Sequence, residues 1–393
     1  MRKKFLAVLL CVAMIFTVMG CSSSNKGDNK ADATKAPAAT EAGKVADNVA
    51  DKAGDLSKAN VAVFYYTYSD TYISSVRTAL DTSLKKLGVT YQDYDSNSNQ
   101  TTQNEQIDTA ISTGATLLVV NIVTSGSVDA SQAIVDKASA AGIPIIFFNR
   151  AVEGNDDEGT VLGSYDKLAF VGTDAPEAGH MQGQMIGDYL VKNYKAVDLN
   201  GDGVISYAMF MGQLGNVEAI YRTQYAVEDA NAVLDKNGYP KLAYFDASNK
   251  DAYQVDQDGN WSATASNNYM NTNLSQYNEQ NKNMIELVIC NNDGMAEGAI
   301  SALNDKGYNL GTSASKTIPV FGVDATDAAK QLIADGKMTG TIKQDAQGMA
   351  DCIAFLTNNA ATGKALMDGT DSYKKSDKVA NKIYIPYGTY TGE

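Results

Sequence analysis

Oxygen-bearing side chains recur at every second position in one short stretch of the sequence. Asp198, Asn200 and Asp202 are followed by Val204, whose carbonyl belongs to the same series, and by Ser206. In an EF-hand calcium loop, ligands come from positions 1, 3, 5, 7 and 9, and a glycine at position 6 makes the sharp turn. The pattern therefore predicts a calcium site, with a plain turn rich in Asn, Asp and Gly as the alternative.

The same stretch lacks the last ligand of an EF-hand. Position 12, where an EF-hand places a bidentate glutamate, is Met209 here. Residues 206–211 are largely apolar and predict a buried strand, whereas an EF-hand continues into a helix. The missing carboxylate of a calcium site must then come from a distant part of the chain.

A second set of polar side chains follows predicted strands. The apolar runs 61–66, 145–148, 207–211, 287–289, 320–323 and 341–342 read as strands, and the residues just past them are Asp70, Tyr72, Asn149, Asn216, Glu218, Arg222, Asn291, Asn292, Asp293, Asp324, Gln344 and Asp345. Ligands of open α/β sheets bind at the carboxyl ends of strands. These side chains suit a polyhydroxylated ligand, because each hydroxyl both donates and accepts hydrogen bonds. Each of them alone could instead be a helix N-cap.

A sugar also needs flat apolar walls. Tyr72 stands one turn into the first predicted helix, and Trp261 is the only tryptophan. Trp261 follows the turn 256–260, so we expect its ring to be partly exposed. Stacking on a ligand and an ordinary core position are both open for this ring.

Short strands and helical stretches alternate from Asn60 onward. This alternation predicts the α/β class, with parallel sheets covered on both faces. The strands are too many for one sheet, and residues 59–393 are too many for one small core, so we expect two α/β lobes.

The N-terminus predicts export. Arg2, Lys3 and Lys4 precede the apolar run 5–19, which is typical of a secretory signal over residues 1–21. The small residues before Cys21 resemble a bacterial lipobox, which would make Cys21 the lipidated first residue of the mature protein. An ordinary signal peptide is the alternative. Residues 22–58 have almost no sizeable apolar side chain and predict a flexible tether.

The net charge excludes several classes of partner, and the cysteine count argues against a disulfide framework. The formal net charge is −14, and removal of the three basic residues in 1–21 brings it to −14 − 3 = −17. Such a chain is unsuited to nucleic acid or anionic lipid. After processing, only Cys290 and Cys352 remain free, so a disulfide framework is not expected.

The sequence resembles the galactose/glucose-binding proteins, which are periplasmic type I solute-binding proteins of sugar ABC transporters. The resemblance spans about residues 60–387 and is densest in the segments Tyr68–Tyr72, Asn104–Asp108, Phe147–Asn149, Ser164–Asp166, Phe170–Asp174, Asp198–Gly203, Asn291–Ala296 and Ile318–Asp324. It implies two Rossmann-like, doubly wound lobes joined by a three-segment hinge. The N-terminal lobe would be 59–172 plus 345–385, and the C-terminal lobe 173–344 plus 386–393.

The resemblance also implies a site. The sugar would lie between the lobes against Asp70, Asn149, Asn216, Glu218, Arg222, Asn292, Asp324 and Gln344, with Tyr72 and Trp261 stacking on it. Glu286 would complete a structural calcium site with Asp198, Asn200, Asp202, the Val204 carbonyl and Ser206. The chain departs from the family pattern at several of these positions: Asn216 replaces a His, Glu218 an Asp, Gln344 an Asn, Tyr72 a Phe and Ser206 a Gln.

We therefore expect a monomeric, lipid-anchored extracytoplasmic protein that binds D-galactose or D-glucose and delivers it to an ABC permease, with a chemoreceptor as a further possible partner. One alternative keeps the fold and binds a pentose or another small polar solute. A secreted glycoside hydrolase is a second, although the chain has neither G-x-S-x-G nor a P-loop, and we expect no enzyme. A sugar-responsive regulator is a third, although no DNA-binding headpiece is evident.

Overall fold

The computed structural model describes residues 56–392. The predicted signal peptide, nearly all of the tether and Cys21 lie outside the described residues. Within the described part, no helix is both long and apolar enough to cross a membrane.

The strands of the described chain form two sheets. Sheet A has the order β12-β13-β5-β4-β3-β1-β2, with β1 (Asn60–Tyr65), β2 (Thr90–Asp95), β3 (Leu117–Val120), β4 (Ile145–Phe148), β5 (Leu168–Gly172), β12 (Lys374–Lys375) and β13 (Lys382–Tyr384). Sheet B has the order β14-β11-β10-β9-β6-β7, with β8 also paired to β6; its strands are β6 (Ser206–Met211), β7 (Ala243–Tyr244), β8 (Gln254–Val255), β9 (Leu287–Cys290), β10 (Val320–Asp324), β11 (Gly340–Gln344) and β14 (Tyr387–Tyr390). The pairs are parallel except β11 with β14 and β12 with β13.

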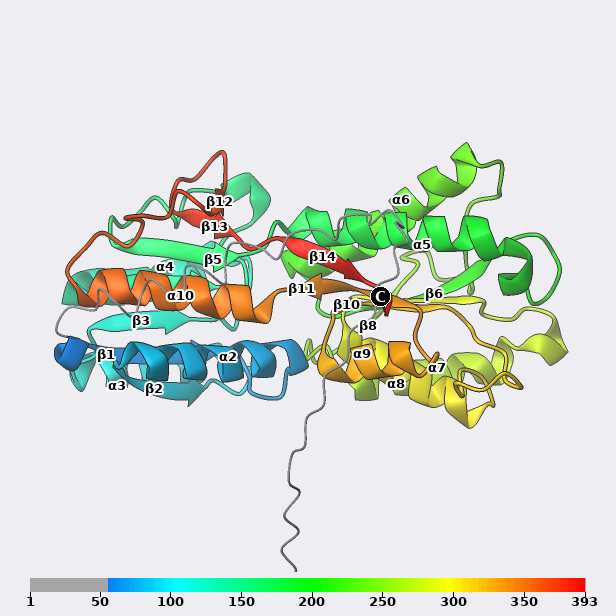
Figure 1. Cartoon of the computed structure of the whole chain (residues 1–393), viewed down its shortest axis with the longest axis horizontal. Helices are drawn as coiled ribbons and strands as arrows, with labels where there is room; N and C mark the ends of the chain where they lie inside the picture. Colours follow the sequence, from blue (N-terminus) through cyan, green and yellow to red (C-terminus); the bar gives the residue numbers. More distant parts are fainter. Residues whose placement is uncertain (1–55, 393) are drawn as a thin grey trace, which may run out of the picture. The chain divides into compact units, whose positions relative to one another are not determined.

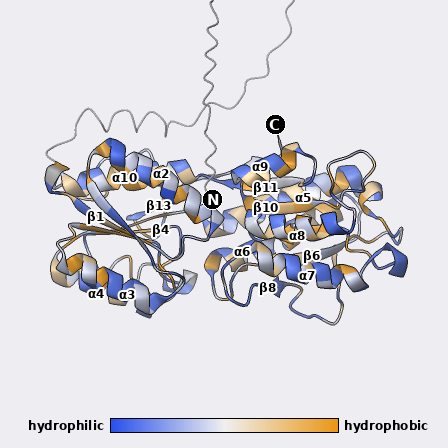
Figure 2. Ribbon diagram, turned by 90° about the horizontal axis from the view of Figure 1, so that it is seen from below, coloured by the Kyte–Doolittle hydropathy of each residue, from blue (hydrophilic) through white to orange (hydrophobic). Residues whose placement is uncertain are grey.

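Helices cover both faces of each sheet. On sheet A, α2 (Thr71–Leu87) and α10 (Ala346–Ala361) cover one face, and α3 (Gln100–Ser112) and α4 (Val128–Ala141) cover the other (Figure 2). On sheet B, α5 (Ala175–Val197) and α6 (Val217–Lys236) lie opposite α7 (Ala263–Gln276), α8 (Asp293–Asp305) and α9 (Asp327–Ala334) (Figure 1). Short 3-10 turns are η2 (Leu56–Lys58), η3 (Asn155–Asp157) and η4 (Glu279–Asn281). The α/β class with parallel sheets is confirmed.

The central strands are buried on both faces. In β1, Val61, Val63 and Tyr65 belong to the core under α2 and α10, whereas Ala62 and Phe64 belong to the core on the opposite face. A strand covered from both sides loses water at every residue, which is why these runs are continuously apolar.

The chain passes between the two sheets three times. It crosses after β5, between β11 and α10, and between β13 and β14. Two of these connections are tied together, because the N–H of Ile385 donates to the carbonyl of Gly172 at 2.7 Å. We call sheet A with its helices lobe A, and sheet B with its helices lobe B.

Helices α5 and α6 approach each other closely along a row of glycines, Gly179, Gly183 and Gly187, spaced one turn apart on α5. A Cβ at Gly179 would lie 2.4 Å from the carbonyl oxygen of Tyr221 on α6, and one at Gly183 would lie 2.5 Å from that of Tyr225. Only residues without a side chain allow this approach. We call this row the glycine ladder.

Several elements were not predicted from the sequence, and the longest of them are β2 and α7. β2 carries alternately exposed and half-buried residues at the edge of sheet A, so it lacks the apolar run of a central strand. α7 is rich in Asn and carries no charge in its first or last turn. It is held instead by the Ser262 N-cap and by burial of Met270 and Leu274 one turn apart.

Candidate functional site

One cavity gathers all ten side chains assigned to a sugar site from the sequence. Its lining comes from both lobes and consists of Tyr66, Asp70, Tyr72, Ile73, Asn149, Arg150, Asn216, Glu218, Arg222, Trp261, Asn292, Asp324 and Gln344. The cavity measures about 40 Å³, so its walls lie close together. We call it the cleft.

Three of the cleft residues are helix N-caps as well. Asp70 accepts the N–H of Ile73 at 2.8 Å and begins α2, while its other oxygen accepts the Tyr66 hydroxyl at 2.6 Å. Asn216 begins α6 and Asn292 begins α8 in the same way. Capping and ligand binding are therefore compatible, because the cap bond fixes the rotamer and leaves other polar atoms available.

Three residues of the cleft have a positive φ, a backbone conformation that six other non-glycine residues of the described chain also adopt. Asn149 and Trp261 have φ of 61° and 56°, and Asp324 has φ of 127°. Such conformations in non-glycine residues cost about 1–3 kcal/mol each and persist where the surroundings enforce them, commonly at functional sites.

Asp293 holds the strained segment after β10. Its side chain is buried beside that strand, and one carboxylate oxygen accepts the Thr341 hydroxyl at 2.6 Å while the other accepts the N–H of Thr326 at 2.8 Å. Burial raises the pKa of Asp293 to about 7. Asp293 thus does more than begin a helix, because it fixes the backbone directly after Asp324.

Arg222 forms the hub of the cleft on the lobe B side. Only 4% exposed, it donates to the Asn291 carbonyl at 2.9 Å, the Gln344 side-chain oxygen at 2.8 Å and the Tyr387 hydroxyl at 3.2 Å. Burial raises the pKa of Asp324 well above its usual value, and the charge of Arg222 opposes that rise. The guanidinium is therefore the principal charge that favours ionised Asp324.

Four buried polar atoms in the cleft have no hydrogen-bond partner within the described chain: Glu218 Oε2, Arg222 Nε, Trp261 Nε1 and Gln344 Nε2. Burial raises the pKa of Glu218, and Arg222 opposes this shift. An unpaired buried polar group costs about 1–3 kcal/mol. One acceptor and three donors in a single cavity are therefore a set that a polar ligand can satisfy.

The expectation that Trp261 is partly exposed was wrong, because its side chain is only 8% exposed. The ring packs against Gly212, where a Cβ would lie 2.1 Å from ring atoms. The Asp256 carboxylate accepts the N–H groups of Asp258 and Ser262 on either side of the tryptophan. The turn before Trp261 therefore anchors the residue and directs the ring inward.

Arg150 and Tyr66 are cleft residues that the sequence analysis missed. The Arg150 guanidinium lies 4.1 Å from the centre of the Tyr66 ring and donates to the carbonyls of Ile122 and Val123. Tyr66 directly follows β1, and Arg150 is the second residue after β4. Because ligands bind at the carboxyl ends of strands, the same search of strand ends could have found both residues.

Among the side-chain contacts that join the lobes, two flank the cleft. Arg150 donates to the side-chain oxygen of Gln213 at 2.6 Å, and the Ser98 hydroxyl lies 3.0 Å from the side-chain oxygen of Asn260. Both contacts must break if the lobes move apart.

The predicted calcium loop is organised by its own side chains. The Asp198 carboxylate accepts the N–H groups of Gly201 at 2.8 Å and Gly203 at 3.0 Å. Asn200 and Asp202 each accept the N–H of the residue two positions further on, both at 2.8 Å. These bonds leave a compact turn with its side-chain oxygens on alternate residues.

Glu286 lies against this loop. Its fully buried carboxylate accepts the N–H groups of Leu199 at 2.7 Å, Asn200 at 3.0 Å and Ser206 at 3.0 Å. Burial raises its pKa, and these three N–H bonds oppose the rise. The Ser206 hydroxyl donates to the Met284 carbonyl.

The loop residues fit calcium by chemistry. Within the described residues, no three His, Cys, Asp or Glu side chains stand close enough to form a metal cluster as they are. Calcium is bound by carboxylate, amide and carbonyl oxygens, and a carboxylate oxygen that accepts one N–H keeps a second lone pair. The residues that would hold the ion are Asp198, Asn200, Asp202, Val204 through its carbonyl, Ser206 and Glu286.

Comparison with known proteins identifies the family. Residues 61–365 match the periplasmic binding protein domain. The chain is 33% identical, over 83% of its length and 88% of the relative, to the D-galactose/methyl-galactoside binding periplasmic protein MglB of Haemophilus influenzae. It is 22% identical, over 85% and 87% of the two chains, to the ribose import binding protein RbsB of Bacillus subtilis.

A solved structure has the same fold. An ABC transporter solute binding protein from Clostridium phytofermentans with bound β-D-glucose matches with a TM-score of 0.64 and 20% identity, covering 85% of this chain and 94% of that one. Proteins of the matched family act outside the cytoplasm, where they bind solutes that are to be transported, and they are not enzymes. The chain belongs to the periplasmic binding protein family.

Proposed function

We propose that the protein binds D-galactose or D-glucose in the cleft and delivers it to an ABC permease. The observation that carries this proposal is the set of four unpartnered polar atoms on Glu218, Arg222, Trp261 and Gln344. A monosaccharide offers hydroxyls that donate and accept, so one ligand can satisfy both kinds of group. The 33% identity to a protein named for D-galactose supports a hexose.

Binding would proceed by a hinge motion about the three connections between the lobes. A cavity of about 40 Å³ is smaller than a hexose, so the lobes must move apart to admit the ligand and then come together with the sugar between them. Arg150–Gln213 and Ser98–Asn260 are contacts that would break on opening and reform on closure. Tyr72 and Trp261 would face the apolar surfaces of the sugar ring.

A pentose or another small polar solute is the second candidate. The similarity to a protein named for ribose import favours it, and the fold is the same. The departures at Asn216, Glu218 and Gln344 change the reach of each group by about one methylene, and a difference of that size alters discrimination by about 1–3 kcal/mol.

The test is a titration of the purified protein with D-glucose, D-galactose, D-ribose and D-xylose. Trp261 is the only tryptophan, so its fluorescence reports on the cleft directly. We expect a hexose to bind with a Kd of about 1 μM or below and without turnover. Preference for a pentose, or formation of a product, would overturn the proposal.

Lipid anchoring is part of the proposal and rests on the sequence alone. Arg2 to Lys4, the apolar run 5–19 and Cys21 support it. Replacing Cys21 by Ala should release the protein from the membrane fraction, and Cys11→Ala is the matched control. If both variants stay with the membrane, the anchor is not at Cys21. A chemoreceptor partner and a monomeric state remain predictions.

We also propose that the loop at Asp198–Ser206 and Glu286 binds a structural calcium ion. The alternation of oxygen donors and the approach of Glu286 to the loop support this assignment. The ion would add to stability because only the folded protein brings the distant glutamate to the loop.

A further inference from the structure

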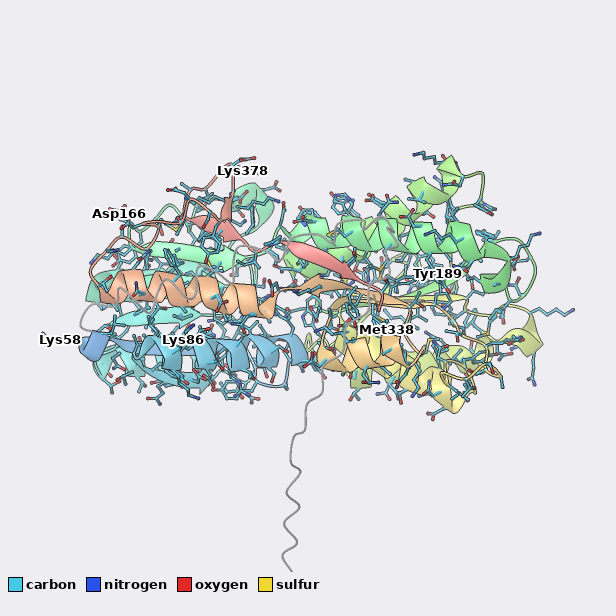
Figure 3. All side chains as sticks on the ribbon, in the orientation of Figure 1. Lys58, Lys86, Asp166, Tyr189, Met338 and Lys378 are labelled. Atoms are coloured by element: carbon cyan, nitrogen blue, oxygen red, sulfur yellow. The ribbon has the colours of Figure 1, made fainter. Side chains whose placement is uncertain are left out.

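A second cavity, of about 390 Å³, adjoins the cleft. Its walls come from both lobes: the β12–β13 connection and residue Phe170 on one side, and the beginnings of α5 and α6 on the other. Lys378, labelled in Figure 3, stands in the β12–β13 connection. The volume lies within the range of about 300–1,000 Å³ typical of small-molecule sites.

The two cavities share Glu218. This residue lines both, is 7% exposed, and has one carboxylate oxygen without a partner in the described chain. The charges that act on its carboxyl come from Arg222 and Arg150 in the cleft and from Lys382 in the second cavity. A ligand in the cleft that reaches Glu218 therefore has the second cavity directly beside it.

Two lysines of the second cavity form ion pairs with its carboxylates. Lys382 lies 2.8 Å from the Glu158 carboxylate, and Lys374 lies 3.5 Å from that of Asp174. Both ammonium groups also lie over the ring of Tyr384, at 5.4 and 5.6 Å from its centre. A balanced set of donors and acceptors around an aromatic ring suits a neutral, hydroxyl-rich group better than an ion.

We propose that the second cavity receives the substituent of a hexoside whose hexose ring occupies the cleft, so that the ligand class includes disaccharides. This inference rests on the proposed function, because it takes the cleft as the site of the hexose ring. The substituent would leave the first ring on the side that faces Glu218. The ammonium and carboxylate groups of the Lys382 and Lys374 ion pairs would then offer hydrogen bonds to hydroxyls of the second ring.

Calorimetric titration of the purified protein tests the inference. The probes are D-galactose and D-glucose, and the disaccharides lactose, melibiose, maltose and cellobiose, each with a second ring joined through O1 of a hexose. We expect at least one disaccharide to bind within about tenfold of the matching hexose, since a fitting second site offsets the cost of the larger ligand. The inference is overturned if all four disaccharides bind more than about tenfold weaker while a hexose binds. If neither hexose binds, the proposed function itself fails.

A variant at Ala151 locates the second ring. Ala151 lines only the second cavity, and its carbonyl is held by the N–H of Gly126 at 2.7 Å, so a larger side chain there extends from a fixed backbone. Ala151→Phe should weaken the disaccharide by about tenfold or more and leave hexose binding unchanged, because it fills space that only the second ring needs.

Ala151→Ser is the matched control, and it should bind both ligands like the unaltered protein. Equal disaccharide affinity in Ala151→Phe and Ala151→Ser, with both variants folded and binding hexose, would place the second ring elsewhere and overturn the inference. If Ala151→Phe does not fold, the comparison of hexoses with disaccharides on the unaltered protein decides alone.

Discussion

The predicted calcium loop and the cleft both contain Asp, Asn and Glu, but they use their polar atoms in opposite ways. In the loop, the oxygens of Asp198, Asn200 and Asp202 accept N–H groups of the loop itself, and Glu286 accepts three more. In the cleft, four buried polar atoms have no partner within the described chain. A satisfied network stabilises the fold, whereas an unsatisfied one costs stability that a ligand can offset.

The difference separates two roles. Changes in the loop should alter stability and leave sugar affinity nearly intact. Changes in the cleft should alter affinity more than stability. The experiments that follow measure affinity for changes in the cleft and stability for changes in the loop.

The largest effect is expected from Arg222→Met in the cleft. The arginine is fully surrounded and bonds Asn291, Gln344 and Tyr387, and its charge compensates buried Asp324. Loss of one partner of a buried charge pair should weaken hexose binding on the order of 100-fold or more. Arg77→Met, which removes an arginine outside both regions, should change affinity by less than about twofold. An unchanged affinity in Arg222→Met would show that the cleft does not bind the sugar.

Glu286→Gln tests the loop. Gln keeps the volume but has a single acceptor oxygen, so part of the N–H set is left unpaired, and a loss of about 1–3 kcal/mol in the free energy of unfolding is expected. Chelation of calcium should lower the thermal midpoint of the unaltered protein and leave that of the variant unchanged.

Glu297→Gln is the matched control, because it removes another half-buried glutamate of lobe B outside the loop. It should keep the response to chelation. If chelation has no effect on the unaltered protein, the loop is a turn and not a metal site.

Trp261→Leu should weaken sugar binding by about tenfold, since ring stacking contributes about 0.5–1.5 kcal/mol beyond the burial of apolar area. Calorimetry replaces fluorescence, because the variant has no tryptophan. Gly212→Ala should also weaken sugar binding, because a methyl group at this position displaces the Trp261 ring. Equal affinity in both variants and the unaltered protein would remove Trp261 from the site.

The smallest effect concerns pH. Burial raises the pKa of Asp293 to about 7, and an unfolded aspartate ionises near about 4. The folded state thus binds this proton more tightly, so this group lowers stability as pH rises from about 4 to about 7. The side chain of Asp293→Asn cannot ionise. The free energy of unfolding of this variant, measured with denaturant, should therefore fall less steeply between about pH 4 and pH 7. Asp327→Asn, an exposed aspartate at the same helix position on α9, should keep the slope, and equal slopes in all three proteins would contradict the assignment.

Features that depend on short sequence spacings were predicted correctly more often than features that depend on which residues become buried. The two-residue period of the loop and the polar residues at strand ends depend on short spacings, so the sequence displays them directly. The ring of Trp261 was misplaced because its burial depends on Gly212, which is remote in sequence. Arg150 was missed because its role depends on the distant carbonyls of Ile122 and Val123. The edge strand β2 was missed because its residues are only half-buried.

The glycine ladder has a consequence for how ligand preference can change. α6 carries Asn216, Glu218 and Arg222 at its first turns, and its distance from α5 is set by Gly183 and its neighbours. A single methyl group in this seam would displace the whole helix and shift three cleft side chains together. Directed evolution could therefore retune selectivity from this buried seam between α5 and α6 while every residue of the cleft keeps its identity.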